Sequence, residues 1–165
     1  MGSGKTFIGK RLAMNLNIPF VDLDAEIVKF EKKSINKIFI DKGEMYFRKI
    51  EKQCLKNILS SPLISVISLG GGTPCYYNTI NDLNDNKINE TVFLRASIET
   101  LTSRLYNEIN KRPKIKYLNT KNNLNNFIRK HLFERNHYYN KSKHIIDVDN
   151  KSIIEIIEEI ILKLT

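Results

Sequence analysis

The chain has 165 residues, 41% of them hydrophobic, so it is long enough for one globular domain with a buried core and is not a disordered segment. Its formal net charge is +9, but the lysines and arginines are spread along the chain, which argues against a dedicated nucleic-acid-binding protein. It has no apolar run of the ~18 residues that span a membrane, no basic-then-apolar leader and no CxxC pair, so we expect a cytoplasmic protein without a disulfide framework.

The first residues, Gly2-Ser3-Gly4-Lys5-Thr6, match the second half of the phosphate-binding loop G-x-x-x-x-G-K-[ST]. Backbone N–H groups of this loop surround phosphate oxygens, the lysine reaches the β/γ-phosphates and the threonine hydroxyl ligates Mg²⁺. The next helix points its positive N-terminal end at the same anion. The first glycine of the motif and its usual preceding strand would lie upstream of Met1, so we expect the reading frame to continue there. The alternative is a flexible glycine-rich start to a helix.

Helical and extended patterns alternate along the rest of the chain. Apolar periodicity and capping residues predict helices over 6–16, 25–30, 43–59, 78–83, 97–106, 124–139 and 152–164, with a helical turn over 34–40. Short apolar runs predict strands over 19–23, 63–69, 91–94 and 144–148. Residues 107–123 have no clean period and should form a mobile loop. This alternation predicts a three-layer α/β/α fold with a parallel sheet.

Three further features occur in order after the loop, and each follows or lies near a predicted strand end: Asp22-Leu23-Asp24, Gly70-Gly71-Gly72 and Arg112-Pro113. Open parallel sheets bind their ligands at the carboxyl ends of strands. Together with the segments GEMYFRKIE (43–51) and ERNHYY (134–139), this ordered set resembles the shikimate kinases, small P-loop kinases of the nucleoside-monophosphate-kinase type. The resemblance implies a single domain over residues 1–165, a lid at about 107–123, and strand order 2-3-1-4-5 with strand 1 absent from the printed sequence.

The resemblance also implies that ATP and Mg²⁺ are used to phosphorylate the 3-hydroxyl of shikimate, on the route to chorismate and the aromatic amino acids. The nucleotide-binding residues would be Gly2, Ser3, Gly4, Lys5, Thr6, Phe7, Arg104 and Arg112, with Mg²⁺ near Thr6 and Asp22. The residues that contact shikimate would be Asp24, Arg48, Gly70, Gly71, Gly72 and Arg135. Catalysis would depend on Lys5, Asp24 and Arg112.

The residue types suit these roles. Asp22 and Asp24 lie two apart at the end of a predicted strand. Strand alternation would place both carboxylates on one face, but the rule loosens at a strand end, where they could diverge. An aspartate here is also a common helix N-cap. The planar guanidinium of Arg48 can bind a carboxylate through two hydrogen bonds, and Glu51, one helical turn away, could hold it in place. The alternative for the arginine is a surface salt bridge, and for the glycine run a plain loop.

Other functions stay open at this point. A related small-molecule kinase, such as a gluconate kinase, would share the loop and the fold but would have no carboxylate-bearing ring for Arg48 and Arg135. An inactive truncated remnant and a nucleic-acid binder are further alternatives. After Arg112-Pro113 the chain departs from the family, because partly charged Lys114-Ile115-Lys116 replaces apolar residues. The three histidines have no metal-ligand spacing. We expect the protein to be a monomer.

Overall fold

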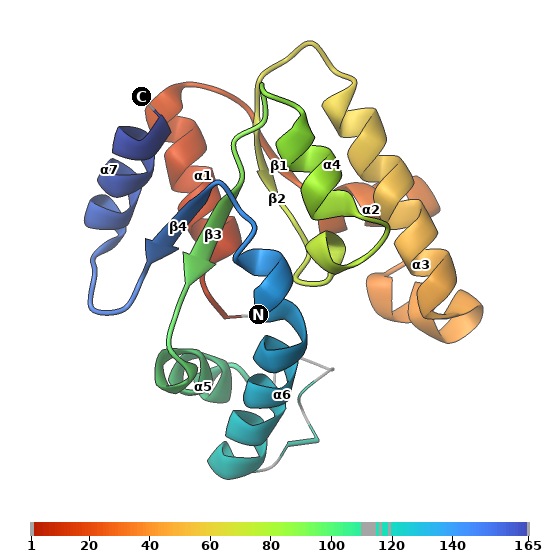
Figure 1. Cartoon of the computed structure of the whole chain (residues 1–165). Coiled ribbons are helices and arrows are strands. Elements are labelled where there is room, and N and C mark those ends of the chain that lie inside the picture. The colour runs from red at the N-terminus through yellow and green to blue at the C-terminus, as the bar shows by residue number, and fades with distance from the viewer. Residues whose placement is uncertain (1, 110–114, 116, 119, 165) are drawn as a thin grey trace. The chain divides into compact units, whose positions relative to one another are not determined.

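The computed structural model describes residues 2–109, 115, 117, 118 and 120–164, and Figure 1 shows its helices and strands. The chain forms two compact units. Residues 5–79 form one, called the N-terminal unit below. Residues 1–4 and 80–165 form the other, called the C-terminal unit. Each unit contains one pair of parallel strands with helices packed against it.

The N-terminal unit contains α1 (Lys5–Leu16), β1 (Phe20–Asp22), α2 (Leu23–Glu31), α3 (Ile35–Leu59), β2 (Val66–Ser68) and the 3₁₀ turn η1 (Thr73–Cys75). Strands β1 and β2 pair in parallel, with Phe20 opposite Val66 and Asp22 opposite Ser68. Helix α1 packs closely on this pair at Gly9, where a methyl group would lie 2.8 Å from the Phe20 ring. Because both strands end at the same edge, Asp22 and the glycine run after Ser68 emerge together.

Helix α3 contains a break at Gly43. The Ser34 hydroxyl caps its start by accepting a hydrogen bond from the backbone of Lys37. Gly43 has φ 78° and ψ 174°, which divides α3 into a short first part and a long second part. A positive φ of this kind favours glycine, which explains the separate predictions of a turn over 34–40 and a helix over 43–59. The second part carries Arg48 and Glu51 on its buried side.

The C-terminal unit contains most of α4 (Thr79–Asp85), then β3 (Val92–Arg95), α5 (Ile98–Asn107), α6 (Lys121–Tyr139), β4 (His144–Asp147) and α7 (Ile153–Leu164). Strands β3 and β4 pair in parallel, with Arg95 opposite Asp147. Serine and threonine caps start its helices, because Ser97 accepts from Thr100 and Thr120 accepts from Asn123.

Most predicted elements are confirmed, and the differences concern their ends. Residues 63 and 64 are exposed and precede the strand, so β2 covers only Val66–Ser68 of the predicted 63–69. Helix α6 begins at Lys121, three residues early, because Thr120 caps it. Ile115 and Leu118, in the expected mobile loop, are buried in a cluster with apolar residues of α5 and α6. In α7, Ile156, Ile157 and Ile160 are buried, whereas Ile153 is 37% exposed.

The strand pairing agrees with two parts of the expected sheet order. In the order 2-3-1-4-5, the observed pairs β1–β2 and β3–β4 correspond to 2-3 and 4-5. The gap expected between these pairs stays a prediction. Within the described residues, no helix is both long and apolar enough to cross a membrane.

Candidate active site

The phosphate-binding loop leads directly into α1. Gly2 and Gly4 have φ values of 74° and 88°, so both positions favour glycine. A methyl group on Gly2 would also lie 2.9 Å from Cγ of Leu105 on α5. Lys5 is the first residue of α1, and the first turn of this helix has no acidic side chain. The helix end is therefore suited to an anion, as the sequence motif predicts.

Thr6 and Asp22 lie side by side in the N-terminal unit. The Thr6 hydroxyl donates a 3.1 Å hydrogen bond to Oδ2 of Asp22. The other carboxylate oxygen, Oδ1, accepts a 3.2 Å hydrogen bond from the backbone of Ala25 and caps α2. Asp22 thus serves as a helix cap and also lies beside the loop threonine. These two side chains present adjacent oxygen atoms, which are the ligands that Mg²⁺ prefers.

The prediction that Asp24 shares a strand with Asp22 is wrong. β1 ends at Asp22, and Asp24 lies in the first turn of α2 because the Asp22 cap starts the helix there. The Asp24 carboxylate is nevertheless directed at the glycine run. A methyl group on Gly70 would lie 3.3 Å from Oδ1 of Asp24, 3.0 Å from Oε1 of Glu51 and 3.1 Å from Oγ1 of Thr73. Three oxygen-bearing side chains therefore surround the backbone of Gly70.

Arg48 is held between two carboxylates of its own helix. Nη1 donates a 2.8 Å hydrogen bond to Oε2 of Glu51, while Nε and Nη2 donate to Oε1 of Glu44 at 3.3 and 3.1 Å. The Arg48 and Glu51 side chains are only 7% and 3% exposed, so this is a buried ion pair and the predicted support from Glu51 is confirmed. Burial opposes the charge of Arg48, but its hydrogen bond to Glu51 raises its pKa above the ordinary value.

The glycine run makes room for this arginine. A methyl group on Gly72 would lie 2.7 Å from both Cζ and Nη1 of Arg48, so any side chain there would displace the guanidinium. Gly72 itself has an ordinary φ of −93°. Gly72, and less strictly Gly70, therefore permits close approach of side chains and does not have an unusual backbone conformation. The plain-loop alternative does not account for this crowding.

Four further predicted residues lie on α1, in the C-terminal unit or outside the described residues. Arg104 is exposed near the end of α5. Arg135 is half-buried on α6, one turn after His131, and it adds to the effect of burial in lowering the pKa of that histidine. Phe7 is 51% exposed on α1 of the N-terminal unit. Arg112 lies outside the described residues.

Comparisons with known proteins agree with this arrangement. A sequence model of the shikimate kinase family matches residues 1–165. The chain belongs to the shikimate kinase family. It is 43% identical to the shikimate kinase of Flavobacterium psychrophilum over 160 residues, which cover 97% of this chain and 92% of that protein.

Solved shikimate kinases have the same fold. The enzyme from Bacteroides thetaiotaomicron matches with a TM-score of 0.90 and 32% identity, covering 99% of this chain and 93% of that one. The enzyme from Acinetobacter baumannii, solved in complex with shikimate, matches with a TM-score of 0.81 and 26% identity, covering 99% and 88% of the two chains. The chain is therefore an ATP-dependent kinase that acts on a hydroxyl group, with the P-loop kinase fold.

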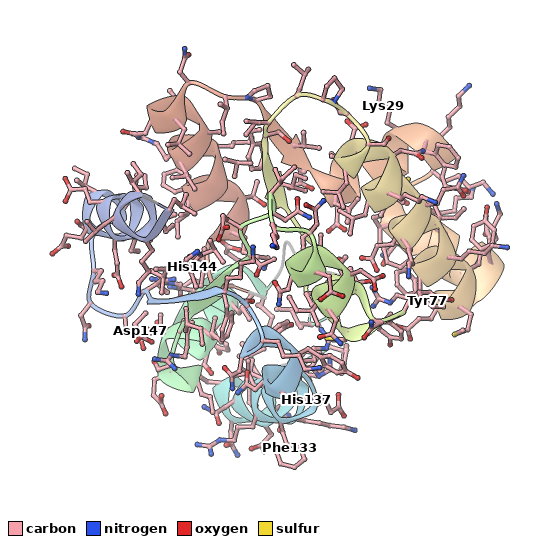
Figure 2. The ribbon with its side chains drawn as sticks, turned by 45° about the horizontal axis from the view of Figure 1, so that its top comes forward. Lys29, Tyr77, Phe133, His137, His144 and Asp147 are labelled. Atoms are coloured by element: carbon pink, nitrogen blue, oxygen red, sulfur yellow. The ribbon has the colours of Figure 1, made fainter. Side chains whose placement is uncertain are left out.

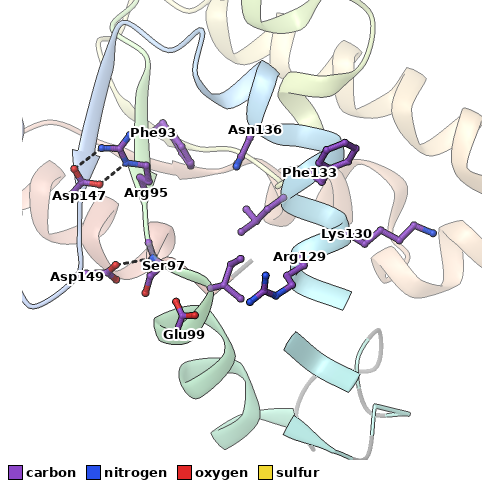
Figure 3. Close-up of a pocket in the computed structure, with 13 residues that line it drawn as sticks. Phe93, Arg95, Ser97, Glu99, Arg129, Lys130, Phe133, Asn136, Asp147 and Asp149 are labelled. Atoms are coloured by element: carbon purple, nitrogen blue, oxygen red, sulfur yellow. Dashed lines mark hydrogen bonds and ion pairs between the residues drawn. The ribbon is translucent and has the colours of Figure 1, made fainter. Parts of the chain in front are cut away.

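A pocket of about 760 Å³ in the C-terminal unit contains none of the residues expected from the shikimate kinase resemblance (Figure 3). The ends of β3 and β4, the start of α5 and the middle of α6 line it. At its edge, Nε and Nη2 of Arg95 donate to the two carboxylate oxygens of Asp147 at 2.5 and 2.7 Å. Phe133 on α6, 89% exposed, extends from the surface (Figure 2).

Sequence reasoning missed three members of the Arg48 environment. Glu44 precedes Arg48 by four residues, so the spacing of helical ion pairs could have identified it. Thr73 donates a 2.7 Å hydrogen bond to Oε1 of Glu51, and Tyr76 donates a 2.9 Å hydrogen bond to Oε1 of Glu44. Both residues come from a segment more than 20 positions away, and no local pattern indicates these contacts.

Proposed function

We propose that this protein transfers the γ-phosphate of ATP to the 3-hydroxyl of shikimate. The observation that supports this most directly is the convergence of Asp24, Arg48, Gly70 and Gly72 in the N-terminal unit. A carboxylate, a guanidinium and a side-chain-free backbone are the groups needed to orient a hydroxyl, bind a carboxylate and accommodate a ring. The Acinetobacter relative in complex with shikimate supports the same acceptor.

Each group has a distinct task in the proposed reaction. Asp24 orients the attacking hydroxyl and accepts its proton as the new O–P bond forms and the bond from the γ-phosphorus to ADP breaks. Phosphoryl transfer needs mainly positioning and charge stabilisation, so the orienting role of Asp24 is the larger one. Lys5 and the backbone of Gly2 to Thr6 stabilise charge on the phosphates. Arg48, Gly71 and Arg135 bind shikimate, while Phe7, Arg104 and the lid residue Arg112 contact the nucleotide.

A magnesium ion would be held by Thr6, with Asp22 acting directly or through water. The two oxygen donors lie next to each other, 3.1 Å apart, at the start of α1, and their hard-oxygen character fits this metal. When bound, Mg²⁺ neutralises charge on the β- and γ-phosphate oxygens. We also propose that the protein acts as a cytoplasmic monomer.

A panel of acceptors tests the assignment. The full chain is incubated with ATP, Mg²⁺ and either shikimate or gluconate, and phosphorus NMR follows the formation of a phosphate monoester. Shikimate alone should be phosphorylated. Efficient phosphorylation of gluconate would favour the related kinase, and turnover of neither acceptor would contradict the proposed activity. Salt-dependent binding to random duplex DNA would instead favour the nucleic-acid reading.

A further inference from the structure

Two hydroxyl groups reach the carboxylates beside Arg48 from one short segment, which comprises η1 and the residue after it. Thr73 Oγ1 donates to Oε1 of Glu51 at 2.7 Å, and Tyr76 Oη donates to Oε1 of Glu44 at 2.9 Å. The same two carboxylates accept hydrogen bonds from Nε, Nη1 and Nη2 of Arg48. The guanidinium is thus bracketed by two glutamates, each tied to the segment by a hydroxyl.

We propose that Thr73 and Tyr76 are positioning residues that fix the Arg48 guanidinium for the carboxylate of the acceptor substrate. We call the four residues Glu44, Glu51, Thr73 and Tyr76 the arginine clamp. Its role rests on the shikimate kinase activity proposed above.

The need for a clamp follows from the charges around Arg48. Glu44 and Glu51 together outweigh the single positive charge of the arginine, so net charge does not attract a further anion. Attraction then depends on N–H groups that point at the incoming carboxylate. Glu44 and Glu51 accept one bond from each of the three nitrogens of Arg48, and each terminal nitrogen carries a second N–H group. A carboxylate accepts two such bonds in a forked pair, provided that the guanidinium is held still.

The Tyr76 hydroxyl restrains Glu44 more firmly than its helical pairing with Arg48 does. Glu44 and Arg48 are four residues apart, and the Glu44 side chain is 50% exposed, so this pair alone would exchange readily with water. The Tyr76 hydroxyl bonds to the same Glu44 oxygen as the guanidinium, and its ring centroid lies 4.4 Å from Cζ of Arg48. Burial and the bond to Glu44 raise the pKa of Tyr76, so the hydroxyl keeps its proton and remains a donor near neutral pH.

On the Glu51 side of the guanidinium, both Thr73 and Glu51 are buried. Glu51 uses Oε2 for Arg48 and Oε1 for Thr73, so the threonine hydroxyl fixes the rotation of the carboxylate that holds Nη1. Gly72 lies against the guanidinium from the same segment. Residues 72–76 therefore approach Arg48 with an aromatic ring and a glycine, and they bond to its two glutamates through two hydroxyls.

The clamp is tested with Thr73→Val and Tyr76→Phe, which remove each hydroxyl while nearly preserving shape. The KM for shikimate should rise about five- to tenfold in each variant, as for the loss of one ordinary intramolecular hydrogen bond. The kcat and the KM for ATP should stay within about twofold of wild type, because neither hydroxyl is placed at the phosphates. In an Arg48→Lys background, each change should cost little more.

Matched controls are available in the chain. Tyr46 lies on α3, as Arg48 does, but it donates its hydroxyl to Glu31 of α2 at 2.7 Å, so Tyr46→Phe should leave the KM for shikimate unchanged. Thr102 is as buried as Thr73 and donates to the backbone of Ile98, so Thr102→Val should do the same. Thr73→Ser keeps the hydroxyl and should restore the wild-type KM. An equal rise of KM in the controls, or wild-type KM values in both clamp variants, would overturn the clamp.

A second readout needs no substrate. The Nε–H group of Arg48 should give a resolved, slowly exchanging signal in ¹⁵N NMR of the full chain, and Tyr76→Phe should broaden it or speed its exchange. Unchanged exchange in Tyr76→Phe would overturn the clamp even if the acceptor were not shikimate. If wild type does not phosphorylate shikimate but the Arg48 signal behaves as expected, the proposed substrate is wrong and the clamp stands. If Thr73→Val does not fold, Thr73→Ser and Tyr76→Phe decide the matter.

Discussion

Arg48 and Arg95 each bind carboxylate through more than one hydrogen bond, yet they lie in opposite environments. The Arg48–Glu51 pair is buried, with the two side chains 7% and 3% exposed, and further groups hold it in place. The Arg95–Asp147 pair links the ends of β3 and β4, with the two side chains 51% and 56% exposed (Figure 3). The two units of the chain thus use the same chemistry once inside the core and once in water.

The difference shows that fork geometry alone does not identify a functional arginine. Arg95 has the shorter bonds, at 2.5 and 2.7 Å, but water screens its charge and competes for its donors. Arg48 has longer bonds and is surrounded by protein, where charges interact more strongly and an unpaired group is costly. We therefore expect changes around Arg48 to affect activity and stability, and changes around Arg95 to affect neither strongly.

The largest effect should be on kcat, when the carboxylate of Asp24 is replaced. Asp24→Asn should lower kcat by about 10²–10⁴-fold, the usual range for loss of an acid–base or orienting group. The fold should be retained because Asp24 is exposed. The rate of shikimate phosphorylation measures the first effect, and thermal melting measures the second.

Asp147→Asn is the matched control, since it makes the same chemical change at an exposed aspartate at the end of β4. It should leave kcat near the wild-type value. Equal losses in the two variants would remove the distinction between the regions, and near-normal turnover of Asp24→Asn would remove Asp24 from the mechanism.

The second effect is on stability. Glu51→Ala removes one partner of the buried pair and leaves the Thr73 hydroxyl without its acceptor. It should lower the free energy of unfolding by about 3 kcal/mol, near the lower end for a broken buried ion pair, because Glu44 still pairs with Arg48. Urea denaturation gives the value, and Asp147→Ala provides the comparison. A similar loss in Asp147→Ala would show that exposure does not separate the two arginines.

Local signals in the sequence account for much of the fold. Ser34, Ser97 and Ser152 each precede a helix, and each hydroxyl accepts a hydrogen bond from the backbone three residues later. Gly43 marks the break in α3, and the three-residue spacing of Arg48 and Glu51 predicts their ion pair. These features depend on neighbours within one helical turn, so they can be predicted without the tertiary structure.

Contacts between distant segments could not be predicted in the same way. Thr73 meets Glu51 across 22 positions and Tyr76 meets Glu44 across 32, and helical spacing carries no signal for either. The family resemblance predicts roles for Asp24 and the glycines, but strand alternation misplaced Asp24, because the Asp22 cap starts α2 at Leu23, one residue before Asp24. The position of Asp24 depends on whether the chain extends β1 or starts α2 after the Asp22 cap, and a local pattern does not decide between the two.

A smaller effect should distinguish a carboxylate-binding arginine from a merely buried one. Arg48→Lys keeps the charge but loses the planar fork, so the KM for shikimate should rise about 10- to 100-fold. A substrate analogue with the carboxylate reduced to an alcohol should bind wild type more weakly by a similar factor. Combined, the two changes should cost little more than either alone. Simply additive losses would show that Arg48 does not hold that carboxylate.

The smallest effect concerns the exposed pair itself. The hydrogen bond from Arg95, with the charges of Arg95 and Lys151, holds the pKa of Asp147 below its ordinary value, although partial burial opposes this. A carboxyl whose pKa is lowered by folding contributes stability above its unfolded pKa of about 3.9, and the contribution is lost as pH falls through the folded pKa. Asp147→Asn should therefore be slightly less stable than wild type at pH 7, and the difference should shrink as pH falls below about 4 and vanish below the folded pKa of Asp147. Urea denaturation of both proteins across this range measures it, and added salt at pH 7 should shrink the difference because the pair is in water. A difference that persisted at low pH would mean that Asp147 acts through packing and not through its charge, and a difference as large as that of Glu51→Ala would erase the contrast between the two arginines.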